Sequence, residues 1–420
     1  MPRSLVQRLC RTSRRWFVAG AMLAAPLAQA FVVLPRLGGE VSGEAFLLGE
    51  TGPGLHWKFS PTSADGGVRE IVFQADNAFT RLRVLARINA ATGDGTWRVE
   101  EGRIEAGPWF SAFAPRLGPE MAGAVAEGSV LITGSGEIHQ GKPAGRIRVE
   151  WRDGAVRHAG QKWALEGIMV RAEADVATLP QGPVPIEITV RTVTNARLGA
   201  RNVAISATLA GSGNVSVTSA RVEIAGGEIT AEPFVASLSP LSLQNVKVRM
   251  TRIGLQDIVA LVPAALAAAR GRIDGEVRLG WNKADGLQIG EGRLSLRDDE
   301  PTVIRLTPQP GFLTSHVPAR FVFAPRLPPW LRRWFSPLNP AYESMQVIEL
   351  GQTDLHVRSL EVKMTPEGDG GGRSAKVVVV AQPEQAGNVV GQVTFEINVF
   401  GPLANVLVLG MKQHLSFGMH

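Results

Sequence analysis

Side chains that could support catalysis or metal binding are scattered through this sequence without a recognisable arrangement. None of the seven histidines stands in an H-E-x-x-H motif or at another spacing that holds a metal ion. The sole cysteine, Cys10, lies close to the N-terminus, and the sequence contains no G-x-S-x-G elbow. These residue types therefore predict no enzyme, no metal and no cofactor. The histidines are His56, His139, His158, His316, His356, His414 and His420.

Three short motifs resemble ligand-binding loops but lack a necessary part. "TGSGEIH" (133–139) lacks the third glycine of a dinucleotide loop, and "GDGGGRS" (368–374) lacks the lysine of a phosphate loop. "RDDE" (297–300) brings three carboxylates together before Pro301, a pattern that favours a solvated turn over a calcium or catalytic site. All three motifs are therefore interpreted as parts of hairpins and turns.

The positive charge of the chain is concentrated at its N-terminus. The formal net charge is +6, and five arginines lie among the first 15 residues without an acidic residue, which leaves +1 for the remainder. Elsewhere acidic and basic residues are interleaved. The sequence therefore predicts no basic surface for DNA or RNA.

Residues 1–34 have the features of an export signal: a basic start, an apolar run and a small-residue cleavage pattern at Ala28 to Ala30. The apolar segment 16–34 contains 19 residues, enough to span a bilayer at ~1.5 Å per residue, so cleavage and retention as an inner-membrane anchor both remain open. "SRRWFVA" (13–19) fits a twin-arginine signal as well as an ordinary leader. Either route places the chain in the periplasm.

The rest of the chain is dominated by strand patterns. The 47 glycines and 27 prolines indicate many turns, while a hydrophobic content of 45% indicates that apolar surface is still buried. Apolar and polar residues alternate with period two, which predicts antiparallel hairpins and meanders. The predicted strands cover 69–75, 80–90, 96–106, 145–154, 184–193, 202–211, 214–225, 245–253, 375–382 and 391–400.

Helical patterns are few. The strongest is 255–270, which Pro263 is expected to kink or divide, and shorter helices are predicted at 119–127, 328–335 and 339–350. An internal repeat is also predicted, with 99–110 aligned on 224–235 and a helix and glycine-rich strands following each copy.

The apolar faces of three amphipathic stretches are the candidate functional surface. Either they form the closed core of a β-sandwich, or one long sheet folds over on itself as a gutter whose apolar interior stays open for a guest; period-two alternation fits both. The candidate residues are Val246, Val248, Met250, Ile273, Val277, Leu279, Trp281, Val393, Phe395, Ile397 and Val399.

One short piece, "PPWLRRWF" (328–335), combines aromatic and basic residues. This composition suits a membrane interface, where indole rings and cations meet lipid headgroups, and it also fits a core-packed helix with an exposed arginine pair. The membrane-interface candidates are Trp330, Arg332, Arg333, Trp334 and Phe335.

Several motifs after residue 224 resemble a known family. They are G-x-I-x-A-x-P at Gly227 to Pro233, "GLQDIVAL" (254–261), "ARGRIDGEVRL" (269–279), "GLQIGEGRLSL" (286–296) and the closing "GPLANVL" (401–407). In these motifs residues 224–410 resemble the C-terminal region of YdbH-like proteins of the AsmA-like superfamily, for which an older label is dicarboxylate transport. Residues 35–223 resemble the family in their β-repeat character.

The resemblance implies a mainly β fold, an elongated and curved antiparallel sheet folded into an open apolar groove (a β-taco) with a few short helices. It implies a leader or anchor at 1–34, an N-terminal β-repeat region at 35–223 and a C-terminal groove region at 224–420. The implied activity is non-enzymatic transfer of phospholipid between the inner and outer membranes. The implied partners are the inner membrane at the N-terminus and a small outer-membrane lipoprotein, or another copy, that adds a strand to an open edge such as 391–400. The alternative is a periplasmic scaffold or outer-membrane assembly factor with a closed core.

Overall fold

The computed structural model of the chain describes residues 39–400 apart from gaps at 47–52, 64–66, 118–120, 180, 196–198, 212, 239–240, 260–265, 283–284, 322–335, 367–372 and 385–388. The predicted leader and the predicted helix at 328–335 lie outside the described residues. The described strands belong to one antiparallel sheet of 22 strands, and the described helices are short. The prediction of a mainly β, antiparallel fold with a few short helices is confirmed.

The chain divides into two compact units, which are described separately. Unit 1 comprises Met1–Val222, Ala231–Gln244 and Asn282–Ala284, and unit 2 comprises Glu223–Thr230, Asn245–Trp281 and Asp285–His420. Four of the described strands contribute residues to both units: β12 (Asn214–Ile224), β13 (Gly227–Ala231), β15 (Leu241–Gly254) and β17 (Arg272–Asn282).

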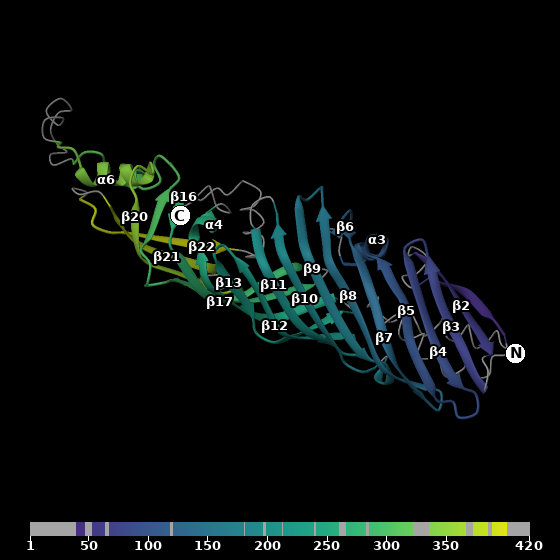
Figure 1. The fold of residues 1–420 in the computed structure, drawn as a ribbon. Helices are drawn as coiled ribbons and strands as arrows, with labels where there is room; N and C mark the ends of the chain where they lie inside the picture. Colours follow the sequence, from purple (N-terminus) through teal and green to yellow (C-terminus); the bar gives the residue numbers. More distant parts are fainter. Residues whose placement is uncertain are drawn as a thin grey trace. The chain divides into compact units, whose positions relative to one another are not determined.

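Unit 1 is a meander in which nearly every strand pairs with the next strand along the chain. The ladder runs from β1 through β2, β3, β4, β5, β7, β8, β9 and β10 to β11, and the short β6 pairs with β8. Strands β2 to β5 and β7 to β11 lie side by side as one twisted sheet (Figure 1). The bounds are β1 Val41–Phe46, β2 Gly54–Ser63, β3 Val68–Asn77, β4 Thr80–Asn89, β5 Gly95–Glu105, α3 Ala106–Leu117, β6 Val125–Glu127, β7 Ser129–His139, β8 Lys142–His158, β9 Trp163–Asp175, the 3-10 turn η5 Val176–Thr178, β10 Val184–Thr194, β11 Gly199–Leu209 and β14 Phe234–Leu238.

Unit 2 is built in the same way with more interruptions. Strand β15 pairs with β13 and β17, β16 with β19, and β18 and β19 both pair with β20, which leads through β21 to β22. The bounds are β13 Gly227–Ala231, α4 Leu255–Val259, β16 Leu266–Arg270, β17 Arg272–Asn282, β18 Gly286–Leu296, β19 Thr302–Leu306, η6 Thr314–His316, α6 Pro340–Glu349, β20 Leu355–Met364, β21 Arg373–Pro383 and β22 Val393–Phe400.

Every predicted strand is found, with shifted ends, because alternation of period two places one apolar and one polar face on an extended chain. The three ligand-loop motifs are also explained. "TGSGEIH" lies within β7, "RDDE" is a turn before β19, and the strands on either side of "GDGGGRS" pair with each other. The glycine-rich loop itself lies outside the described residues.

Two helix predictions are wrong in part or in full. Of the described residues in the segment 255–270, the first five form the helix α4 and the last five form the strand β16, because β19 offers them a backbone ladder that overrides the helix preference of alanine. The segment 119–127, predicted as a helix, ends in the strand β6. The helix of this region is α3, which precedes that segment. The helix predicted at 339–350 is confirmed as α6, where the Asn339 side chain caps the N-terminus and Pro340 occupies the first turn.

The internal repeat exists in a different register from the predicted one. Pro108 and Trp109 lie in α3, whereas the aligned Pro233 precedes β14 and Phe234 is its first residue, so the predicted alignment is wrong. The structure instead repeats a path of long strand, helix, short strand and long strand. This path is β5, α3, β6 and β7 in unit 1 and β15, α4, β16 and β17 in unit 2.

The hydrogen bonds of the two paths agree. The first amide of α3, at Ala106, donates to the Gly128 carbonyl (2.9 Å), and the first amide of α4, at Leu255, donates to the Gly271 carbonyl (3.0 Å). Both glycines have positive φ angles, +104° and +118°.

The buried residues agree as well. Two residues before each glycine, a buried alanine faces a buried β-branched residue of a later strand: Ala126 pairs with Val156, and Ala269 pairs with Ile304. We therefore define module 1 as residues 68–209 and module 2 as residues 214–400.

Candidate functional site

An apolar inner face extends across the strands of unit 1. In β4, Leu82, Val84 and Ile88 are buried, whereas the intervening Arg81 and Arg83 are exposed. Residues at equivalent positions from β2 to β14 pack into one cluster, so this face continues from strand to strand rather than closing within one hairpin. Its buried members are Leu55, Phe59, Ile71, Phe73, Ala75, Leu82, Val84, Ala86, Ile88, Trp97, Ile104, Ile132, Ile138, Ile147, Ala174, Val176, Val184 and Leu209, and Leu238 of β14 packs against them.

Aromatic side chains fill the first part of this face. The rings of Phe59 and Phe73 lie 4.6 Å apart, and Trp57 meets Phe59 edge-on at 5.8 Å. None of these residues is among the candidates predicted from sequence, all of which lie between 246 and 399. The signal that could have found this face is the alternation in "TRLRVLARINA" (80–90), which places Leu82 and Val84 on one side of the strand and Arg81 and Arg83 on the other.

The inner face is only partly buried on β10 and β11, although Val184 and Leu209 near the strand ends are buried. Ile186 and Ile188 of β10 and Val203 and Ile205 of β11 are half-buried, although their polar neighbours in sequence point the other way and are exposed. In β12, Val215 is half-buried in the same manner. An apolar row that keeps partial access to solvent is unlike the interior of a closed β-sandwich, whose facing residues exclude water.

Unit 2 brings four of the predicted groove residues together. Ile273 is buried in an apolar cluster, and Met250, Val393 and Phe395 pack against this cluster as half-buried side chains. The other members of the cluster come from β15, α4, β16, β19, α6, β20 and β21, and they include Leu255, Ile304, Ile348 and Leu355.

The remaining predicted residues are not part of that cluster. Val246, Val248 and Val277 are buried outside it. Leu279, Trp281 and Val399 are half-buried, and Ile397 is 37% exposed. The membrane-interface candidates Trp330, Arg332, Arg333, Trp334 and Phe335 lie outside the described residues.

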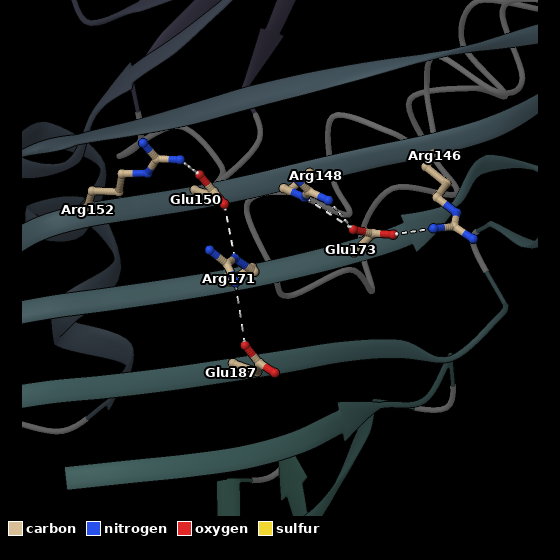
Figure 2. Close-up of polar contacts among 7 residues, drawn as sticks. All are labelled: Arg146, Arg148, Glu150, Arg152, Arg171, Glu173 and Glu187. Carbon is tan, nitrogen blue, oxygen red and sulfur yellow. Dashed lines mark hydrogen bonds and ion pairs between the residues drawn. The ribbon is translucent and has the colours of Figure 1, made fainter. Parts of the chain in front are cut away.

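The opposite face of unit 1 carries a ladder of ion pairs on β8, β9 and β10 (Figure 2). Glu173 accepts from Arg148 (2.8 Å) and Arg146 (3.2 Å), and Glu150 pairs with Arg152 and with Arg171 (3.0 Å). The hydrogen bond from Arg152 lowers the pKa of Glu150 despite its burial, and Arg171 lowers that pKa further. Matched charges across neighbouring strands stabilise the sheet and keep this face in water.

A buried carboxylate fastens a loop of unit 2 to helix α6. Glu349, 2% exposed, accepts hydrogen bonds from the amides of Gly311 (3.1 Å), Leu313 (2.8 Å) and Thr314 (3.0 Å), and from the Thr314 hydroxyl (2.8 Å). Burial opposes the charge of Glu349, but these donors outweigh it and the pKa lies below the ordinary value. The arrangement suits a structural fastening, because all four donors come from one segment.

Within the described residues, no three His, Cys, Asp or Glu side chains are grouped as metal ligands. The described helices are all too short or too polar to cross a membrane. In unit 1 the described strands present an apolar face that passes from strand to strand and is half-buried in part.

Comparison with known proteins gives a match to a family model. The family model described as "YdbH-like: Intermembrane phospholipid transport protein YdbH" matches residues 54–316, and this span includes much of the N-terminal region, where the sequence motifs indicated only β-repeat character. No curated protein and no solved structure matches the chain. Because the family model covers more than half of the chain, from β2 to η6, the chain belongs to the YdbH-like family of intermembrane phospholipid transport proteins.

Proposed function

We propose that the chain is a non-enzymatic carrier that moves phospholipid between the inner and outer membranes along an open groove formed by its inner face. The family supports intermembrane phospholipid transport as the activity. The observation that carries the groove is the partial burial of the inner face on β10 and β11, where Ile188 and Ile205 are half-buried. A half-buried apolar row leaves room for an acyl chain to complete its burial.

The energetics of such a groove need no fixed polar pocket. Covering apolar surface yields ~25 cal/mol per Å², so each buried methylene of an acyl chain contributes ~0.8 kcal/mol wherever it lies along the face. The headgroup remains in water at the mouth. Similar energies at successive positions allow a lipid to slide from strand to strand.

The location and partners follow from the same proposal. The chain works in the periplasm, attached to the inner membrane through residues 1–34 or released from it by cleavage. Within the described residues β22 pairs with β21 alone, which supports strand addition at β22 by a small outer-membrane lipoprotein or by another copy. Residues 35–223 and 224–420 act as the N-terminal β-repeat region and the C-terminal groove region.

A closed-core scaffold or outer-membrane assembly factor is the second candidate. It is favoured by the deep burial of the inner face near β3 to β5, where Ala75 is 0% and Leu82 is 2% exposed. The two functions differ in what the half-buried rows contact, because a scaffold needs no lipid there.

The deciding experiment is mass spectrometry of lipid that co-purifies with the full chain in mild detergent. We expect phospholipid in the wild-type protein and in Ser206→Glu, and its loss in Ile205→Glu, because these neighbours on β11 point to opposite faces. Absence of phospholipid from the wild-type protein, or equal lipid in both variants, would favour the scaffold.

A further inference from the structure

One histidine of unit 1 is built into the fold. His158, the last residue of β8, is only 9% exposed, and its ring packs against the indole of Trp163 in β9 with the ring centroids 5.6 Å apart. By contrast, the side chains of His56, His139 and His356 are 67%, 67% and 46% exposed. Of these four rings, that of His158 is therefore the one whose protonation the surrounding structure must accommodate.

Two hydrogen bonds fix the protonation state of this ring. The Gln161 amide donates to His158 Nδ1 (3.1 Å), and His158 Nε2 lies 2.9 Å from the carbonyl oxygen of Ala122. A backbone amide only donates, so Nδ1 is the unprotonated acceptor, and Nε2 carries the hydrogen that the Ala122 carbonyl accepts. The arrangement therefore fits the neutral ring. A proton on Nδ1 would face the Gln161 N–H and break that hydrogen bond.

The ring joins two separate parts of unit 1. Gln161 lies in the turn between β8 and β9, whereas Ala122 lies between α3 and β6. The strand β6 pairs with β8 over three residues, Val125–Glu127, so the bond from His158 to Ala122 extends a short ladder. Loss of the hydrogen bonds of the ring therefore weakens the attachment of residues 121–127 to β8.

Residues 121–127 cover part of the inner face. Ala124 is 3% exposed and belongs to an apolar cluster that includes Ile168 of β9 and Val190 of β10. Ile168 lies four residues before Ala172, which packs against the inner-face cluster of unit 1, so both side chains point to the same side of the sheet. Release of residues 121–127 would uncover this end of the inner face.

The second module shows that the repeated structure does not require a histidine at this position. Val156 of β8 and Ile304 of β19 are equivalent, so the residue equivalent to His158 is Leu306. Leu306 packs against the apolar cluster of unit 2 as a half-buried side chain. A leucine has no group that takes up a proton, so a response to acid at this position is confined to module 1.

We propose that His158 is a pH-sensitive latch, closed while its ring is neutral and opened when Nδ1 is protonated. Histidine is the side chain whose charge changes between about pH 5 and 8. The latched ring holds one proton fewer than a released, charged ring, so the latched state is favoured as pH rises and is lost as pH falls. The access of acyl chains that the latch controls rests on the proposed function, whereas the latch itself rests on the hydrogen bonds of His158.

The charged groups around the ring are already paired or face solvent. The described side chains of α3 and of residues 121–126 include no titratable group. Arg157, the preceding residue of β8, pairs with Glu127 of β6 (2.8 Å) and Glu166 of β9 (3.1 Å), and Lys162 is exposed in the turn. Carboxylates ordinarily take up protons near about pH 4, so a test between pH 7.5 and 5.5 reports on histidine.

Hydrogen exchange of the full chain at pH 7.5 and pH 5.5 tests the latch. We expect the protection factors of residues 121–127 and 158–163 to fall about tenfold at pH 5.5, because a histidine released into water takes up a proton near about pH 6.5. Protection factors are compared because they correct for the effect of pH on the intrinsic exchange rate. The protection factors of β3 and β4 should stay unchanged.

Three variants separate the histidine from other sources of acid sensitivity. His158→Gln keeps a donor for the Ala122 carbonyl without a titratable ring, and His158→Leu places there the residue type of module 2. In both variants the difference between the two pH values should disappear. His139→Gln is the control at an exposed histidine and should respond to pH like the wild type.

Three results would overturn the proposal. The first is unchanged protection of residues 121–127 in the wild type at pH 5.5, and the second is an equal loss of protection in the wild type and in His158→Gln. The third is a loss that extends to β3 and β4, which would show general acid unfolding. Mass spectrometry of co-purifying lipid separates the two proposals: an intact pH response without phospholipid contradicts the groove alone, and phospholipid without the pH response contradicts the latch alone.

Discussion

The indole Nε1 of Trp97 in β5 donates a 2.9 Å hydrogen bond to the carbonyl of Ala144 in β8, across the intervening strand β7. The indole passes over β7 where that strand carries Gly134 and Gly136; a Cβ at Gly136 would overlap the Ala144 carbonyl and lie 2.7 Å from Trp97 Nε1. The glycines of "TGSGEIH" therefore make room for a buried tryptophan.

The first prediction concerns this packing. Gly136→Ala should lower the free energy of unfolding by about 1–3 kcal/mol, because the new methyl group must displace Trp97 or the β8 backbone. Urea denaturation followed by tryptophan fluorescence measures the change. Gly39→Ala is the control, since a Cβ there meets no atom within 4 Å. Equal stability of the two variants would show that β7 tolerates a side chain beneath Trp97.

The second prediction concerns the two modules. Gly128→Ala and Gly271→Ala should each destabilise their own module by about 1–3 kcal/mol, because both glycines have positive φ and each is packed against a side chain, Trp151 or Thr302. Hydrogen exchange should accelerate in β6 and β8 for the first variant and in β16 and β19 for the second. If only one glycine proves sensitive, the two positions are not structurally equivalent.

The third prediction concerns β22, whose residues Val393, Phe395, Ile397 and Val399 are predicted to line the groove. Ile397→Glu should reduce phospholipid transfer between donor and acceptor vesicles about tenfold or more, because a carboxylate placed against acyl chains loses its hydration. Thr394→Glu adds the same charge to the opposite face of β22, where residue 394 is exposed, and should transfer lipid like the wild type. Equal transfer by both variants would remove β22 from the groove.

The fourth prediction concerns acid stability. The pKa of Glu349 is lower in the folded protein than its ordinary value, so its stabilising contribution is present at neutral pH and is lost as pH falls below about 4.3. Glu349→Gln keeps the shape but removes the charge, and it should cost about 1–3 kcal/mol at pH 7. The difference in unfolding free energy between wild type and variant should shrink as the pH is lowered through this range. A difference that stays constant with pH would show that Glu349 is not charged in the fold.

The sequence by itself determined the class of this fold and the identity of its strands. Alternation such as Leu82, Arg83, Val84 sets one apolar and one polar face wherever the backbone is extended, whatever the chain packs against. The cap Asn339 and the proline after it likewise determined where α6 begins. Motifs after residue 224 were sufficient to indicate the YdbH-like family, which the family match shows.

Only the tertiary structure decided which apolar residues meet and how deeply they are buried. Period two gives a residue its face but not the strand opposite it, so Met250, Ile273 and Phe395 meet in one cluster while Val246 and Val277, with the same pattern, do not. The strand β16 was mistaken for helix because its partner β19 lies more than thirty residues away in the chain. The sequence did not reveal the register of the repeat for the same reason. This register is set by hydrogen bonds from the first amides of α3 and α4 to the carbonyls of Gly128 and Gly271, and such backbone bonds depend little on residue type.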